Sequence, residues 1–263
     1  MLQNNAWTGF LFLIGIFYNF WIMGVGAIAG TIISTISAKL FKYPKEDIEN
    51  GLYGFNGTLV GIAVLFFFEL NIYTVIAIIF GSILSTIIMH EMKKKIPAYT
   101  APFVISTWII ILGIKFLNLA PFISSTISQA SSLDIFSATT MGFGQVMFQG
   151  SVITGLIFLF AIFVNSKLSA FYALYGSLLG IAFALILSLP LNMIGIGLFG
   201  YNAILCGIAF ESIKFKKFIF ATIAILLSVL VSFWMGDIGI ITLTAPFVIS
   251  TWIVLLIRHF LKK

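Results

Sequence analysis

Apolar stretches separated by short polar segments run through the whole chain. They lie near residues 7–20, 23–40, 51–68, 71–90 and 98–117, and again near 150–165, 168–187, 197–211, 218–235 and 244–258. A helix that crosses the hydrocarbon core of a bilayer needs about 20 mostly apolar residues, and several of these stretches are somewhat shorter. The pattern predicts an all-α polytopic membrane protein with five segments in each half.

The composition agrees with this class. Of the 263 residues, 61% are hydrophobic and only 8% are charged, and the mean hydropathy is +1.17. These values are far from those of a soluble globular domain. Cys206 is the only cysteine, so a disulfide, a cysteine metal cluster and a thiol redox pair are excluded. We expect no cofactor and no metal.

The two halves are copies of one unit. Residues 51–63 return as residues 197–209, an offset of 146, with eight of thirteen positions identical. Residues 100–109 return unchanged as residues 244–253, an offset of 144. We therefore assign residues 1–120 to a first repeat that lacks an amino-terminal part, and residues 121–263 to a second repeat. Together they form one membrane domain.

An odd number of crossings per repeat would place the second copy upside down in the membrane. Cytoplasmic loops of membrane proteins collect Lys and Arg, so lysine positions test this arrangement. The lysine clusters of one copy have uncharged counterparts in the other. They are Lys39, Lys42, Lys45, Lys93, Lys94 and Lys95 in the first copy, and Lys167, Lys214, Lys216 and Lys217 in the second. The pattern predicts inverted repeats in the cell membrane with both termini cytoplasmic, and only Lys115 does not fit. The net charge of +6 then reports orientation and not nucleic-acid binding.

Glycines crowd one segment of each copy, within 51–61 and 197–207. In transporters built from inverted repeats, interrupted helices near the bilayer midplane form the substrate site. We interpret these segments as broken helices at a pore. The alternative is that the glycines only let helices pack closely.

The polar residues that recur in both copies are neutral. They are Asn56 with Asn202 and Thr100 with Thr244, beside the apolar pair Leu59 and Leu205. Ion-coupled carriers need ionisable residues inside the bundle, and the repeated motifs contain none. This favours passage of an uncharged polar solute. Structural roles stay open, because Thr before Ala-Pro can cap a helix and Asn between glycines can bind interrupted backbone.

At these residues the sequence resembles the bacterial branch of the urea transporter family. The resemblance rests on Gly-Phe-Asn-Gly-Thr-Leu-Val-Gly at 54–61, Thr-Ala-Pro-Phe at 100–103 and 244–247, and Gly-Phe-Gly-Gln-Val-Met-Phe-Gln at 142–149. It implies a homotrimer in which each subunit holds one pore and conducts urea passively through a narrow slot. Flat walls would sandwich the solute while rows of oxygens accept its NH groups.

The resemblance also implies roles for single residues. Gln145 and Phe148 would form one outer binding position, with Val146 in the same wall. Thr100 and Thr244 would flank the narrow middle. Leu59 and Leu205 would be apolar wall residues beside the broken helices.

The first copy departs from the family pattern at its start. With the offset of 146, Met1-Leu2-Gln3 aligns with Met147-Phe148-Gln149, so Leu2 stands where a second Phe is expected. Nothing in the first copy corresponds to Gln145 or to the uncharged, Ser-rich run 122–144. We expect that the protein begins upstream of Met1.

Three other functions compete with urea passage. A channel for another small neutral solute, such as short amides, ammonia or water, is one. Paired Asn-Pro-Ala motifs and paired membrane His residues, which would mark water or ammonium channels, are not found. An intramembrane enzyme would need a nucleophile with a base or a carboxylate pair inside the bundle, and the motifs offer neither. A non-conducting truncated membrane protein is the third.

Overall fold

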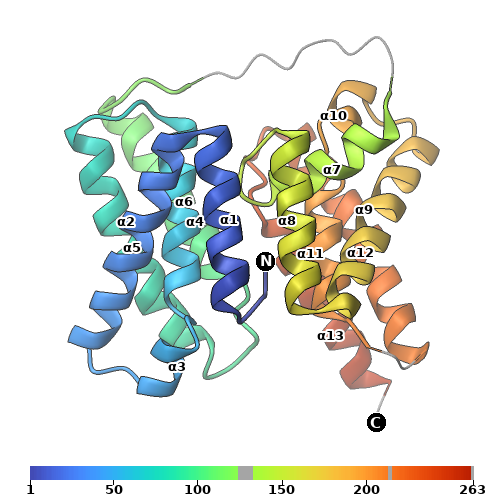
Figure 1. The fold of residues 1–263 in the computed structure, drawn as a ribbon, viewed down its shortest axis with the longest axis horizontal. Helices are drawn as coiled ribbons and strands as arrows, with labels where there is room; N and C mark the ends of the chain where they lie inside the picture. Colours follow the sequence, from blue (N-terminus) through green and yellow to red (C-terminus); the bar gives the residue numbers. More distant parts are fainter. Residues whose placement is uncertain (124–132, 213–214, 262–263) are drawn as a thin grey trace. The chain divides into compact units, whose positions relative to one another are not determined.

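The computed structural model describes residues 1–123, 133–212 and 215–261 (Figure 1). All regular elements in these ranges are helices, which confirms the all-α prediction. The first part contains α1 (Ala6–Asn19), α2 (Trp21–Leu40), α3 (Lys45–Glu49), α4 (Gly54–Phe67), α5 (Ile72–Met92) and α6 (Ala101–Leu117). The rest contains α7 (Ile135–Gln145), α8 (Val152–Asn165), α9 (Lys167–Ile186), α10 (Leu191–Gly195), α11 (Tyr201–Ala209), α12 (Phe215–Asp237) and α13 (Ala245–Phe260).

Each of the ten apolar stretches contains one long or medium helix, so the segments predicted from the pattern are confirmed. Among the described residues, α2, α5, α9 and residues 218–237 of α12 are long and apolar enough to cross a membrane. These are the second and fourth segments of each repeat. The short α3 and α10 and the polar α7 were not predicted.

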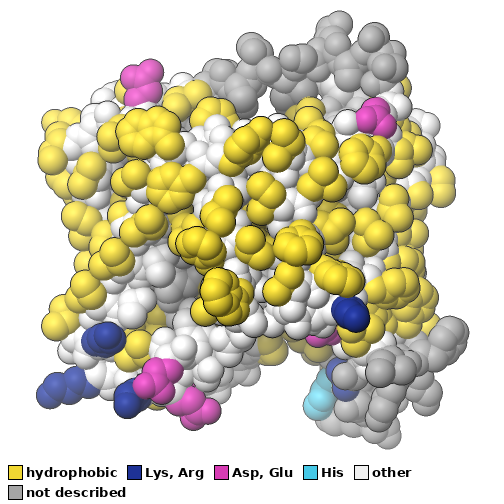
Figure 2. All heavy atoms as spheres, viewed as in Figure 1, with side chains coloured by type: hydrophobic (Ala, Val, Ile, Leu, Met, Phe, Trp, Pro, Cys, Tyr) yellow, Lys and Arg dark blue, Asp and Glu magenta, His cyan; other side chains and the backbone are white. Residues whose placement is uncertain are grey.

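The surface of these helices is apolar. Large hydrophobic side chains are exposed along them, with Phe116 at 86% exposure as an extreme case. On the face seen in Figure 2, hydrophobic side chains cover the middle of the helices, and charged side chains lie toward helix ends. Such a surface is stable only in lipid. The chain is therefore a multi-pass membrane protein.

The chain forms two compact units, residues 16–126 and residues 1–15 with 127–263. We call them the first and second unit, and describe each by itself. They do not coincide with the sequence repeats, because the first half of α1 packs on α8.

The contacts between α1 and α8 inside the second unit are reciprocal. The Thr8 hydroxyl donates to the carbonyl oxygen of Ala161 at 3.0 Å, and the Thr154 hydroxyl donates to that of Gly15 at 3.1 Å. Thr154 and Ala161 are the counterparts of Thr8 and Gly15 at the offset of 146. The counterpart rings Phe12 and Phe158 meet edge to face, with centroids 5.0 Å apart. Reciprocal contacts of this kind are what a two-fold axis produces.

Inside the first unit, α4 packs on α2 at very short range. A Cβ atom on Gly30 would collide with the carbonyl oxygen of Gly57, and one on Gly61 would collide with that of Gly26. The second unit repeats this packing between α11 and α9. There, Gly176 lies against the carbonyl oxygen of Ala203, and Gly207 against that of Tyr172.

The helix interruptions lie just before these packed glycines. Gly51 has φ +69° and Gly197 has φ +81°, a left-handed conformation that glycine adopts without steric penalty. The turns there separate α3 from α4 and α10 from α11. The 14 residues of α4 extend about 21 Å, less than the ~30 Å hydrocarbon core. The interpretation as broken segments is right for Gly51 and Gly197. It is wrong for Gly57 and Gly61, which lie inside a continuous helix and serve close packing.

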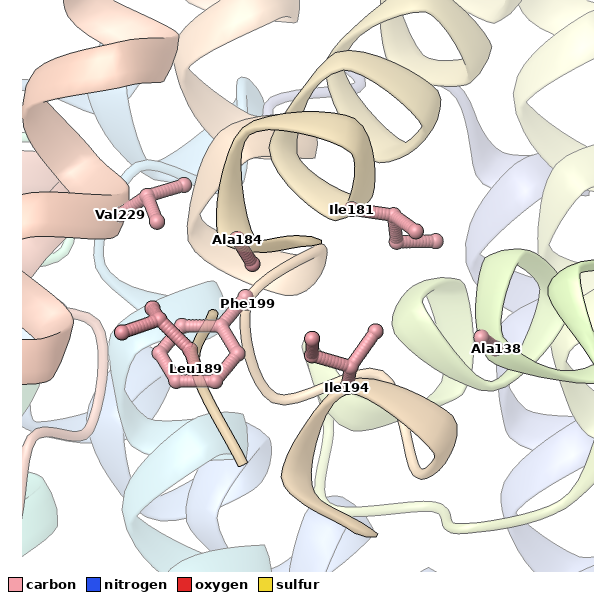
Figure 3. Packing of buried hydrophobic residues seen from close by; sticks show 7 residues of the cluster. All are labelled: Ala138, Ile181, Ala184, Leu189, Ile194, Phe199 and Val229. Carbon is pink, nitrogen blue, oxygen red and sulfur yellow. The ribbon is translucent and has the colours of Figure 1, made fainter. Parts of the chain in front are cut away.

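The end of the second unit that contains α10 and the corresponding end of the first unit, which contains α3, differ in the polarity of their side chains. In the second unit the end is an apolar cluster (Figure 3), in which Leu189 and Phe199 pack with Ile194 of α10 and with Ala184 of α9. Val229 of α12 closes the group. Large apolar side chains thus fill this end of the second unit.

In the first unit some positions that correspond to this cluster carry polar groups, whereas Ala38 and Ile48, the counterparts of Ala184 and Ile194, stay apolar. Tyr43 stacks on His90 with ring centroids 3.7 Å apart, and the Tyr53 hydroxyl lies 3.1 Å from His90 Nδ1. Asp47 forms an ion pair with Lys93 beside them. Tyr43, Asp47 and Tyr53 correspond to the apolar Leu189, Met193 and Phe199. One end of the repeat thus exists in a polar and an apolar form.

Lys115, which did not fit the orientation pattern, has a local partner. Its ammonium lies over the ring of Phe122, 3.9 Å from the centroid. A cation over an aromatic face is stabilised by the ring quadrupole. The residue is thus bound within the first unit.

We expect Gly61→Ala to lower the thermal unfolding midpoint of the detergent-solubilised protein. The new methyl group would collide with backbone that cannot move aside, and overpacking destabilises by about 1–3 kcal/mol. Gly113→Ala in α6 is the matched control, because nothing lies within 4 Å of its added Cβ. Equal midpoints for the two variants would contradict the close packing of α2 and α4.

Candidate functional site

Each unit holds one candidate site, the start of α6 in the first unit and the start of α13 in the second, and each is described by itself. At the start of α6, Ala101 N donates to the carbonyl oxygen of Ala98 at 3.0 Å. Pro102 has no N–H group, and Val104 N donates to the carbonyl oxygen of Thr100 at 3.0 Å. Phe103 N, the next donor of this helix start, takes its acceptor from another helix.

Asn56 of α4 supplies that acceptor. Its Oδ1 atom accepts from Phe103 N at 3.0 Å, and its Nδ2 group donates to the carbonyl oxygen of Tyr99 at 3.4 Å. The side chain is 0% exposed. The third N–H group of a helix is the one that a capping side chain usually binds. Asn56 therefore caps α6 from a different helix.

The second unit repeats this arrangement. Asn202 Oδ1 accepts from Phe247 N at 3.2 Å, and Nδ2 donates at 3.4 Å to the carbonyl oxygen of Leu243 and to the Ser232 hydroxyl. Ala245 N and Val248 N have the same local acceptors as their counterparts. The structural role of the two asparagines, left open by the sequence, is thus to bind backbone at a helix start.

Thr100 and Thr244 occupy the capping positions of α6 and α13 but do not cap with their side chains. Both are buried, with 4% and 2% exposure. The capping role that the sequence allowed for these threonines is wrong, because asparagine side chains bind the helix starts instead. Leu59 of α4 and Leu205 of α11 are buried as well, at 6% and 1% exposure.

The backbone before each threonine is strained. Tyr99 has φ +47° and Leu243 has φ +46°. A residue with a Cβ atom in the left-handed region costs about 1–2 kcal/mol. The carbonyl oxygens of both residues accept from the buried Asn side chains, which helps to hold this conformation.

The Gln145 region lies at the end of α7 in the second unit. Asp134 caps the start of α7 by accepting from Phe136 N and Ser137 N. The Ser137 hydroxyl and these N–H groups hold the pKa of Asp134 below its usual value. At the other end, Gln145 Nε2 donates to the carbonyl oxygen of Ile196 at 3.1 Å.

The chain turns sharply after Gln145. Val146 is 3% exposed and Phe148 has φ +61°. Gln149 Nε2 donates to the carbonyl oxygen of Met147 at 2.8 Å. The predicted outer residues therefore sit on one tight turn that a glutamine side chain braces.

Residues 1–3 share two features of this turn. Leu2 has φ +55°, and Gln3 Nε2 donates to the carbonyl oxygen of Met1 at 3.3 Å. Leu2 thus shares the positive φ of Phe148 but has a smaller, non-aromatic side chain.

The structure brings several of the predicted residues together within each unit. The Asn56 side chain binds the backbone next to Thr100, and the Asn202 side chain binds the backbone next to Thr244. Tyr201 belongs to this site as well, because its hydroxyl donates to the carbonyl oxygen of Leu243 at 2.6 Å. Sequence reasoning missed Tyr201. Tyr201 is next to Asn202 in the sequence and aligns with Phe55 of the first copy. This position was the signal that could have identified it.

The two helix starts are neutral and saturated. A helix start usually offers unpaired N–H groups that attract anions, but Ala101 N and Phe103 N already have acceptors. The threonine side chains and backbone carbonyl oxygens also lie at this point of the chain. Such groups suit an uncharged solute that carries NH donors.

Comparison with known proteins identifies similar chains. A model of the urea transporter family matches residues 1–259. Urea transporter 1 of Ovis aries is 29% identical over 286 residues, which cover 97% of this chain and 73% of the relative. Urea transporter 1 of Mus musculus is 31% identical over 228 residues, which cover 78% of this chain and 58% of the relative.

We expect Asn56→Ala to destabilise the protein more than Thr100→Val. The first change leaves the buried Phe103 N–H without its acceptor, which costs about 1–3 kcal/mol, whereas the second leaves the Asn56 cap intact. Thermal unfolding of both variants in detergent measures the difference. A Thr100→Val variant as unstable as Asn56→Ala would show that the hydroxyl, and not the amide, holds the helix start.

Proposed function

This chain belongs to the urea transporter family, and we propose that it conducts urea passively across the cell membrane as a transporter, without catalysing a reaction. The observation that carries the proposal is the pair of saturated, neutral helix starts at Thr100 and Thr244. They recur in both copies with the same asparagine cap. The site therefore supplies hydrogen-bond acceptors without fixed charge.

Desolvation explains why such acceptors are needed. Moving a polar group out of water without replacement hydrogen bonds costs about 2–7 kcal/mol of free energy, depending on the reference state. Urea carries two NH₂ groups, so a path lined with acceptor oxygens replaces its lost water contacts. The threonine hydroxyls at the two helix starts are our candidates for this replacement. The saturated N–H groups at the same points disfavour anions.

Other residues complete the proposed path. Gln145, Phe148 and Val146 would bind urea at one outer position, and Leu59 and Leu205 would form apolar walls. Leu2 shares the positive φ of Phe148, and we assign it the equivalent place, where its smaller side chain makes a less complete wall. These roles follow from the family resemblance.

Orientation and assembly are part of the proposal. Placing the lysine clusters on the cytoplasmic side of inverted repeats puts both termini in the cytoplasm. The family resemblance suggests a homotrimer in which each subunit holds its own pore.

Uptake of radiolabelled urea into proteoliposomes tests the function. Urea should equilibrate much faster than in protein-free vesicles, and faster than acetamide or glycerol in the same preparation. Equal rates for urea and glycerol would argue for a less selective pore for neutral solutes. Rates equal to those of empty vesicles would reject conduction by this chain.

We expect Thr100→Val and Thr244→Val to slow urea flux with little loss of stability. Each substitution removes a hydroxyl at nearly constant shape, and the asparagine caps remain. Flux should fall about tenfold for each ~1.4 kcal/mol added to the barrier. Stopped-flow or tracer flux per folded protein measures the effect, and unchanged flux in both variants would remove the threonines from the path.

We also expect transport to be independent of ion gradients. The repeated motifs contain no Asp, Glu, His, Lys or Arg that could couple urea to protons or sodium. Addition of an ionophore to proteoliposomes should leave the rate and the end point of urea equilibration unchanged. Accumulation of urea above the outside concentration, abolished by the ionophore, would overturn passive transport.

A further inference from the structure

An apolar groove lies between α8 and α9 in the second unit. Its volume is about 500 Å³. Its lining includes Leu156, Phe160, Phe163, Phe171 and Leu174, with Lys167 as a charged residue. Phe160 and Phe171 are each 57% exposed. The groove therefore opens on the apolar surface of the unit.

Lys167 supplies a cation at one end of the groove. It is the first residue of α9, and its ammonium lies 5.9 Å from the centroid of the Phe163 ring. The described part of the chain gives Lys167 no carboxylate partner. The start of a helix carries a partial positive charge as well. Apolar walls and positive charge thus meet at the groove end.

The first copy shows how such a groove can be closed. There, Phe17 and Gly24 are the counterparts of Phe163 and Ala170. The Phe17 ring lies directly over Gly24, where an added Cβ would come within 2.7 Å of it. In the second copy the Ala170 methyl group occupies that space, so the Phe163 ring cannot settle onto α9. The counterpart of Lys167 is Trp21, so the first copy lacks the cation too.

We propose that this groove binds one anionic phospholipid, with its acyl chain along Phe160, Phe171 and Leu174 and its headgroup phosphate at Lys167. A multi-pass membrane protein meets acyl chains on its apolar face, and the cation selects among headgroups. Charge complementarity decides the occupant, because a zwitterionic lipid fills the apolar walls equally well but gains less from Lys167. A basic residue near the membrane surface typically favours anionic lipid about fivefold.

Quenching by brominated lipid tests the proposal on the full chain. A Phe171→Trp reporter is reconstituted in vesicles that contain acyl-brominated phosphatidylglycerol or acyl-brominated phosphatidylcholine at increasing mole fraction. Emission of the unsubstituted protein is subtracted to remove the native tryptophans. We expect half-maximal quenching of the reporter at about fivefold lower mole fraction of phosphatidylglycerol.

Three further variants make the result decisive. Lys167→Gln in the reporter should abolish the preference, and Lys167→Arg should keep it because the charge remains. Lys39→Gln is the matched control, since it removes an exposed lysine at the end of a different span and should leave the preference unchanged. Size-exclusion profiles exclude misfolding as the cause of a loss.

Three outcomes would overturn the proposal. The first is equal quenching by the two lipids, and the second is a preference that survives Lys167→Gln. The third is a reporter that neither lipid quenches while the native tryptophans are quenched, which would mean that protein, such as a second copy of this chain, covers the groove.

Discussion

The need to satisfy backbone N–H groups inside an apolar environment governs this structure. In the hydrocarbon region no water is available to bind an interrupted backbone, so non-helical segments survive only where other protein groups bind them. Asn56 and Asn202 do this by binding Phe103 N and Phe247 N from neighbouring helices. Because an amide side chain carries no charge, the helix starts are held without introducing an ion into the membrane. The caps and the neutrality of the site are thus one solution to one constraint.

Close helix packing places those asparagines. Gly57 and Gly61 let α4 approach α2 until backbone meets backbone, and Asn56 lies on the same helix, one residue before Gly57. A larger residue at Gly57 would move α4 and with it the cap of α6. The same dependence holds for Asn202, since α11 packs on α9 through Gly207. The glycines and the asparagine in each motif therefore act together, which explains why they stand so close in the sequence.

The hydrophobic pattern predicted the helices because each helix contains a continuous apolar run. The repeat singled out the polar residues that recur in both copies. Neither the pattern nor the repeat could predict hydrogen-bond partners far apart in the chain. Thr100 precedes Ala-Pro and looks like an ordinary cap, yet the acceptor for Phe103 N comes from Asn56, 47 residues away. The Gln145 bond to Ile196 spans 51 residues and has no local signature. Helix α7 escaped prediction because Ser137, Thr139 and Thr140 interrupt any apolar run.

The reciprocal bonds of Thr8 and Thr154 have a consequence for how the sequence can change. They have the geometry of an isologous dimer interface, enclosed within a single polypeptide. In a true homodimer every substitution would appear twice, once on each side of the axis. Fusion of the two copies removes that obligation, so one position can mutate while its mate stays fixed. Leu2, which aligns with Phe148, and Trp21, which aligns with Lys167, are such independent changes. Each gives one copy a property that the other copy lacks.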